Sequence, residues 1–113
     1  MYRECTIDVK MKDNLVIIEV LGDLTTSAEK LMYDAYQKAC GYDAKNIIMK
    51  FDSKSRINSA GIALIIDLVI KSQDSDCKIF LTGVSKHFRK IFELVGLTKY
   101  TSIVDSEEEV VIT

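Results

Sequence analysis

Hydrophobic and polar residues alternate at the start of the chain. In Thr6–Lys12 (TIDVKMK) every second residue is apolar, which is the pattern of a strand that buries one face. Asp13 and Asn14 form a turn signal, and the apolar run Leu15–Leu21 (LVIIEVL) predicts a second strand directly after it. The chain is therefore expected to open with a β-hairpin.

Two later segments have apolar residues at the spacing of an amphipathic helix. The first helix is expected to begin at Thr26, because Thr26 and Glu29 have capping-box spacing, and to end at Gly41. The other is expected to follow Ser85 as its N-cap and to end at Gly96. The stripes predicted to be buried are Ala28, Leu31, Met32, Ala35 and Ala39 in the first helix, and Phe88, Ile91, Phe92 and Val95 in the second.

A further helix, Ala60–Lys71 (AGIALIIDLVIK), is predicted between these two. Asn58 and Ser59 are both suited to cap its N-terminus. The segment is apolar nearly all round, with Asp67 as its single charge before Lys71. Such a helix either lies deep in the domain or meets something outside it.

Short runs between the helices complete the predicted fold. Two of them are apolar enough for strands in a sheet interior, Ile47–Phe51 and Cys77–Leu81. An edge strand is expected at Ser102–Val104. A short terminal helix is expected at Ser106–Glu109, which has capping-box spacing. Because strands alternate with helices after the hairpin, residues 1–113 are expected to form one α/β domain with a mixed, mostly parallel sheet. The expected core includes Ile17, Leu31, Ile48, Ile65, Phe80, Ile91 and Phe92.

Composition narrows the class of protein. The 113 residues suit one domain, and 48% of them are hydrophobic, enough for a real core. No apolar run approaches the roughly 20 residues of a membrane span, no secretory signal is expected, and the net charge of −2 disfavours nucleic acid. Cys5, Cys40 and Cys77 lack the spacing of a zinc site. We expect an acidic cytoplasmic protein with free thiols and no membrane insertion.

The sequence offers little for catalysis. The only histidine, His87, falls on the polar face of the third predicted helix, so neither a Cys/His nor a Ser/His/Asp set can be assembled around it. Neither GxGxxG nor GxxxxGK[ST] occurs, so the sequence lacks the common glycine-rich motifs that bind nucleotide phosphates. We expect no enzyme activity, no cofactor and no bound metal.

Two loops are candidates for a binding site. In parallel sheets, sites form where loops leave the carboxyl ends of strands and enter helix N-termini, and Gly22–Thr26 and Asp52–Ser59 are such loops. Within Ile57–Gly61 (INSAG), Ser59 lies where the loop meets the apolar helix. Helix capping alone would also explain a serine at this position.

Three segments together resemble the STAS domain family, whose fold is shared by bacterial anti-sigma factor antagonists and the cytoplasmic tails of sulfate transporters. Ile57–Ile66 (INSAGIALII) is similar to the family signature apolar-Asp-Ser-(Ser/Thr/Ala)-Gly. Gly22–Leu24 (GDL) is similar to the Gly-Glu-Leu-Asp loop after the second strand. Phe88–Tyr100 (FRKIFELVGLTKY) resembles the segment that follows the fourth β-α connection. The matches occur in the family's order over nearly the whole chain.

The resemblance implies a protein-binding switch. In the antagonists, a serine at the position of Ser59 is phosphorylated by the anti-sigma factor, itself a serine kinase, and a serine phosphatase resets the switch. The expected partners are therefore this kinase and this phosphatase, and the protein itself is expected to be a monomer or a weak dimer. The residues expected to contact the partner are Asp23, Leu24, Thr25, Asn58, Ser59, Ala60, Gly61 and Ile62.

Two departures from the family pattern keep other functions open. Asn58 and Thr25 stand where the family has aspartates, so two carboxylates beside Ser59 are missing, while Lys54 and Arg56 make the loop basic. One alternative is a STAS subunit without a phosphorylation cycle in a larger stress-signalling, lipid-transport or transporter assembly. A sensor of a small ligand or nucleotide is a third class, supported only by the anion-friendly helix N-terminus.

Overall fold

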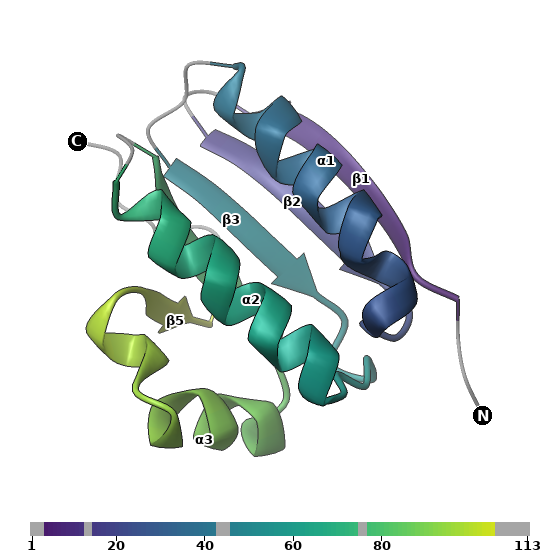
Figure 1. The fold of residues 1–113 in the computed structure, drawn as a ribbon, viewed down its shortest axis with the longest axis vertical. Coiled ribbons are helices and arrows are strands. Elements are labelled where there is room, and N and C mark those ends of the chain that lie inside the picture. Colours follow the sequence, from purple (N-terminus) through teal and green to yellow (C-terminus); the bar gives the residue numbers. More distant parts are fainter. Residues whose placement is uncertain (1–3, 13–14, 43–45, 75–76, 106–113) are drawn as a thin grey trace.

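A five-stranded sheet forms one layer of the molecule and helices form the other (Figure 1). The computed structural model describes residues 4–12, 15–42, 46–74 and 77–105. Its strands are β1 (Thr6–Lys12), β2 (Leu15–Leu21), β3 (Asn46–Phe51), β4 (Lys78–Thr82) and β5 (Ser102–Val104). Its α-helices are α1 (Glu29–Cys40), α2 (Ser59–Ser72) and α3 (Lys86–Leu94), with 3-10 turns at Thr26–Ala28 and Leu97–Lys99.

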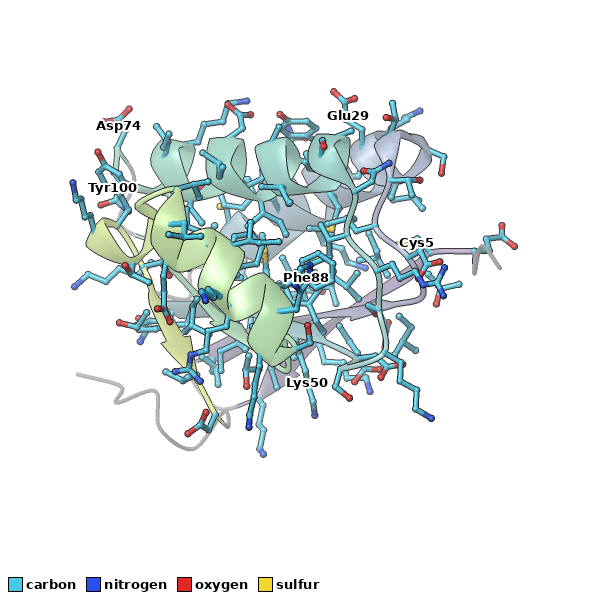
Figure 2. All side chains as sticks on the ribbon, turned by 90° about the horizontal axis from the view of Figure 1, so that it is seen from below. Cys5, Glu29, Lys50, Asp74, Phe88 and Tyr100 are labelled. Atoms are coloured by element: carbon cyan, nitrogen blue, oxygen red, sulfur yellow. The ribbon has the colours of Figure 1, made fainter. Side chains whose placement is uncertain are left out.

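The strands lie in the sheet in the same order as in the sequence. β1 pairs antiparallel with β2, and the pairs β2–β3, β3–β4 and β4–β5 are parallel. The predicted hairpin and the mixed, mostly parallel sheet are therefore confirmed. Because each right-handed crossover moves in the same direction across the sheet, all the helices lie on one face. Figure 2 shows α1 and α2 above the sheet and α3 running obliquely in front of it, while Lys50 lies on the lower side of the sheet.

Most of the core lies between the sheet and the helices. Apolar side chains from β2, β3 and β4 meet Met32 of α1, Ile65 and Leu68 of α2, and Phe92 of α3, all of which are fully buried. A smaller cluster of Leu15, Ile17 and Ile48 lies on the other face. The helix α2, expected either to lie deep or to meet a partner, buries one side against the core and leaves Ala63 and Ile70 exposed on the other.

The predicted core is right in part. Ile17, Ile48, Ile65 and Phe92 are buried, and Phe80 and Ile91 are half-buried. Within the two predicted stripes, Phe88 and Ile91 are half-buried and Leu31 and Val95 are exposed. The others are buried, namely Ala28, Met32, Ala35, Ala39 and Phe92.

Leu31 and Val95 are wrong predictions. Leu31 is 47% exposed, because α1 turns only a narrow stripe of Met32, Ala35 and Ala39 toward the sheet. Val95 is 53% exposed, because α3 ends at Leu94 and the chain leaves the helix before it.

The predicted capping box is also absent. Residues Thr26–Ala28 form a 3-10 turn, so α1 begins only at Glu29 and its N-cap, Ala28, has no capping side chain. The Thr25 hydroxyl instead lies 2.9 Å from that of Ser27. The stop at Gly41 and the Ser85 cap are confirmed, whereas the helix predicted at 106–109 lies outside the described residues.

Candidate functional site

The two candidate loops are joined into one surface. Leu24 and Ile57 form an isolated parallel bridge beyond the ends of β2 and β3. The Leu24 N–H donates to the Arg56 carbonyl at 2.8 Å, and the Asn58 N–H donates to the Leu24 carbonyl at 3.2 Å. The loop before α1 is thereby fixed beside the loop before α2.

Asp23 reinforces this junction from below the surface. Its side chain is only 3% exposed, and its Oδ1 accepts a hydrogen bond from the Arg56 N–H at 3.0 Å. Burial of Cys5, together with the negative charge of Asp23, raises the pKa of the Cys5 thiol. A buried carboxylate that accepts a backbone N–H holds the chain in place.

Gly61 allows α2 to begin close to the other loop. A Cβ atom on residue 61 would lie 2.5 Å from the Leu24 carbonyl oxygen and 2.9 Å from Cγ2 of Ile57. These distances are shorter than non-bonded atoms tolerate, so only glycine fits without a shift of the backbone. The glycine in INSAG therefore has a packing role in this chain.

Asn58, and not Ser59, caps α2. The Asn58 Oδ1 accepts a hydrogen bond from the Gly61 N–H at 2.9 Å, and its own backbone is extended. Ser59 is the first residue of the helix and is exposed, and its hydroxyl has no hydrogen-bond partner among the described residues. The Ser59 hydroxyl therefore does not cap the helix, and the residue is exposed to solvent.

The residues predicted to bind a partner fall into two groups. Asn58 and Ser59 are exposed, and Thr25, Ala60 and Ile62 are half-buried, so these side chains form an accessible surface at the start of α2. Three others are buried and can act only by holding that surface in shape. These are Asp23, Leu24 and Gly61.

A groove between α1 and α2 opens beside this surface. Its volume is about 280 Å³, and it is lined by Thr25, Thr26, Glu29, Tyr33, Ala60, Ala63, Leu64 and Asp67. The groove could not be predicted from the sequence, because Tyr33 and Asp67 are 34 residues apart and belong to separate helices. The only local signal was the i, i+4 spacing of Asp67 and Lys71.

Three side chains form a cluster at one end of the groove. The Tyr33 hydroxyl donates a hydrogen bond to Asp67 Oδ2, and Lys71 Nζ lies 3.2 Å from that carboxylate and 4.6 Å from the centre of the Tyr33 ring. The hydrogen bond to Asp67, followed by burial, raises the pKa of Tyr33 to about 12. The same hydrogen bond lowers the pKa of Asp67.

Over the described ranges, no group of three or more His, Cys, Asp or Glu residues is placed to hold a metal ion. Cys5, Cys40 and Cys77 are free thiols. None of the helices described is long and apolar enough to cross a membrane.

A comparison of the sequence with models of protein families gives a match to the STAS domain over residues 6–110. This range includes the INSAG loop and α2. The chain belongs to the STAS domain family. The resemblance carried by the three sequence segments is thus confirmed.

Three solved structures have the same fold as this chain. An anti-sigma factor antagonist from Mycobacterium paratuberculosis matches with a TM-score of 0.78 at 12% identity, over 94% of this chain and 90% of that one. The Bacillus cell fate determinant SpoIIAA matches in its phosphorylated form with a TM-score of 0.65 at 21% identity, covering 92% and 95% of the two chains. Its unphosphorylated form matches with a TM-score of 0.68 at 19% identity, covering 92% of each chain. At these identities the likeness establishes the fold.

Proposed function

We propose that this STAS domain is an anti-sigma factor antagonist-like switch that binds an anti-sigma serine kinase and is regulated by phosphorylation at Ser59. The observation that carries the proposal is that Asn58 and Ser59 have different roles at the start of α2. Asn58 caps the helix, so the exposed Ser59 hydroxyl is free to accept a phosphoryl group without loss of the cap. Likeness to SpoIIAA, which has been solved in phosphorylated and unphosphorylated forms, supports it.

The proposed reaction transfers a phosphoryl group to Ser59, whose loop is held in place by the hydrogen bonds of Leu24 and Asn58. The kinase supplies ATP, the Ser59 Oγ forms a bond to the γ-phosphorus as the bond to ADP breaks, and the hydroxyl proton passes to a base of the kinase. The product carries about −1.5 to −2 charges at one surface point. Because α2 presents its N-terminal amides there, the phosphate is tolerated by the domain itself.

The effect of the phosphate falls on the interface. The accessible surface at the start of α2 consists of Ser59 with Thr25, Asn58, Ala60 and Ile62. A partner that covers this surface in the unmodified protein has to desolvate the phosphate in the modified one. The buried Asp23, Leu24 and Gly61 keep this surface the same in both states. Phosphorylation therefore weakens binding without unfolding the domain, and a serine phosphatase restores it.

One specific feature favours a second function. Asn58 replaces an acidic residue of the family pattern, and its side-chain oxygen is used for the helix cap. A STAS subunit bound permanently in a larger assembly needs no carboxylate beside Ser59 for recognition by a kinase. This alternative predicts that partner binding is indifferent to a charge at residue 59.

Partner capture from the cells in which the protein is found separates the two functions. The baits are the Ser59→Ala and Ser59→Asp proteins, with Ser102→Asp as a control for an added charge at an exposed position on β5. The switch predicts that Ser59→Ala and Ser102→Asp retain the kinase and Ser59→Asp loses it. Equal recovery with all three baits supports the permanent subunit instead.

A further inference from the structure

The groove between α1 and α2 begins next to Ser59. Ala60, the residue after Ser59, forms part of its wall, and Thr25 and Thr26 line it from the loop before α1. A protein that reaches the Ser59 hydroxyl from the side of α1 therefore also passes over this groove.

One end of the groove already holds a cation from this chain. Lys71 Nζ lies 3.2 Å from the Asp67 carboxylate and 4.6 Å from the centre of the Tyr33 ring. A carboxylate beside an aromatic face is a favourable environment for a positive charge. This end is therefore filled, with Asp67 neutralised by Lys71.

A second carboxylate of the groove, Glu29, lies one helical turn before Tyr33 on α1 and adds to the causes that raise the pKa of Tyr33. Glu29 is exposed and forms no ion pair with any residue that the structure describes. Figure 2 shows it on the helix side of the molecule, directed away from the sheet. Thr25 and Thr26 also line the groove. The Thr25 hydroxyl lies 2.9 Å from that of Ser27, and because a hydroxyl has two acceptor lone pairs it can still accept a second donor beside Thr26 and Glu29.

Elsewhere the lining is small and apolar. Ala60 and Ala63 lie on the α2 side, with the buried Leu64 beside them. A hydrocarbon floor that leads to a carboxylate suits a long side chain with an aliphatic stem and a cationic head. The planar guanidinium of arginine, with five N–H donors, matches the carboxylate and the two hydroxyls better than an ammonium does.

We propose that this groove receives, at Glu29, an arginine side chain of the partner protein that approaches Ser59. The stem lies along Ala60 and Ala63, and the guanidinium pairs with Glu29. The identity of the partner rests on the proposed function, but the chemistry of the groove does not. The exposed Lys54 and Arg56 make the loop before α2 basic, whereas the groove carries the Glu29 carboxylate, and this difference in charge can orient the partner.

Titration with N-acetyl-arginine amide, followed by ¹H–¹⁵N NMR of the whole chain, tests this directly. The expected result is a saturable shift of the Thr26, Glu29, Ala60 and Ala63 amides with a dissociation constant in the millimolar range, and no saturable shift with the neutral analogue N-acetyl-citrulline amide. Glu29→Gln is expected to weaken binding about threefold, as for loss of an exposed ion pair. Glu93→Gln, an exposed carboxylate on α3, is the matched control and leaves binding unchanged.

A second variant keeps the test independent of charge. Ala63→Leu fills the floor of the groove from an exposed position of α2 and is expected to abolish the saturable shifts while the rest of the spectrum stays folded. Equal shifts with arginine and citrulline, or equal affinities for the Glu29→Gln and Glu93→Gln proteins, would overturn the proposal. Ser59→Ala should bind the probe like the unmodified chain, so failure of the phosphorylation switch and failure of the arginine site remain distinguishable.

Discussion

The carbonyl oxygen of Leu24 occupies the space that a side chain on residue 61 would need. The distance from this oxygen to an ideal Cβ on Gly61 is 2.5 Å. The same carbonyl accepts the hydrogen bond from the Asn58 N–H. A single backbone group thus fixes both the loop that leads to Ser59 and the first turn of the helix that bears it.

Gly61→Ala is therefore expected to destabilise the protein, although alanine favours helices. The contact is with backbone, which cannot move aside, so overpacking is expected to cost about 1–3 kcal/mol. Gly41→Ala is the matched control. Its Cβ would lie 3.4 Å from the nearest atom and its φ is −69°, so it is expected to be neutral or to stabilise by about 0.4–1 kcal/mol. Urea denaturation measures both, and equal stabilities would contradict the close approach.

Asn58→Ala is expected to cost more stability than Ser59→Ala. Loss of the cap should remove about 0.5–2 kcal/mol, whereas Ser59 makes no hydrogen bond among the described residues and its truncation should stay within about 0.5 kcal/mol. Thermal denaturation of the two variants side by side gives the order. A larger loss with Ser59→Ala would mean that the serine is the cap.

Truncation of Phe92 tests the packing of α3. Its side chain is fully buried in the main cluster, so Phe92→Ala is expected to cost about 3–5 kcal/mol. Leu94, two residues away, is 77% exposed, and Leu94→Ala is the control with little expected effect. A Phe92→Ala protein that melts within a few degrees of the parent would contradict the placement of this helix.

The pairing of Tyr33 with Asp67 predicts a shifted titration. The hydrogen bond raises the pKa of Tyr33 to about 12, whereas an ordinary tyrosine titrates near 10. Because the folded-state pKa is the higher one, the stabilising contribution is present below pH of about 10 and is lost as the pH rises through the folded-state value. The difference in tyrosinate absorbance between the parent and Tyr33→Phe is expected to have its midpoint near the raised value. A midpoint near 10 would contradict the pairing.

Asp67 gives the opposite pH dependence. Its pKa is lowered by the hydrogen bond from Tyr33 and by Lys71, so its contribution is present above the ordinary carboxyl value and is lost as the pH falls through the lowered one. The carboxylate is 45% exposed, so solvent screens this contribution. Asp67→Asn is expected to move the titration of Tyr33 back toward its ordinary range.

Local patterns were enough to predict the strands, the opening hairpin and the mostly parallel pairing after it. Alternation in Thr6–Lys12 and the short apolar runs at β3 and β4 specify strands, and the right-handed crossover then leaves few topologies. Ser59 at the start of a helix was also predictable, because the INSAG segment is itself local. These features depend on residues within a few positions of one another.

What the sequence did not reveal depends on contacts between distant residues. The Leu24–Gly61 approach and the Tyr33–Asp67 hydrogen bond each join residues more than 30 positions apart. Leu31 has correct helical spacing for burial, but the width of the stripe that α1 turns toward the sheet decides its exposure. Spacing alone also could not decide between Asn58 and Ser59 as the cap.

The most direct test of the central claim is to map phosphate after incubation with the captured kinase and ATP. The switch predicts a single phosphate on Ser59 in the parent chain, found by tandem mass spectrometry, and none in Ser59→Ala. Phosphate absent from Ser59 in the parent, with the kinase bound and active toward ATP, would contradict the proposal that Ser59 is the regulated residue.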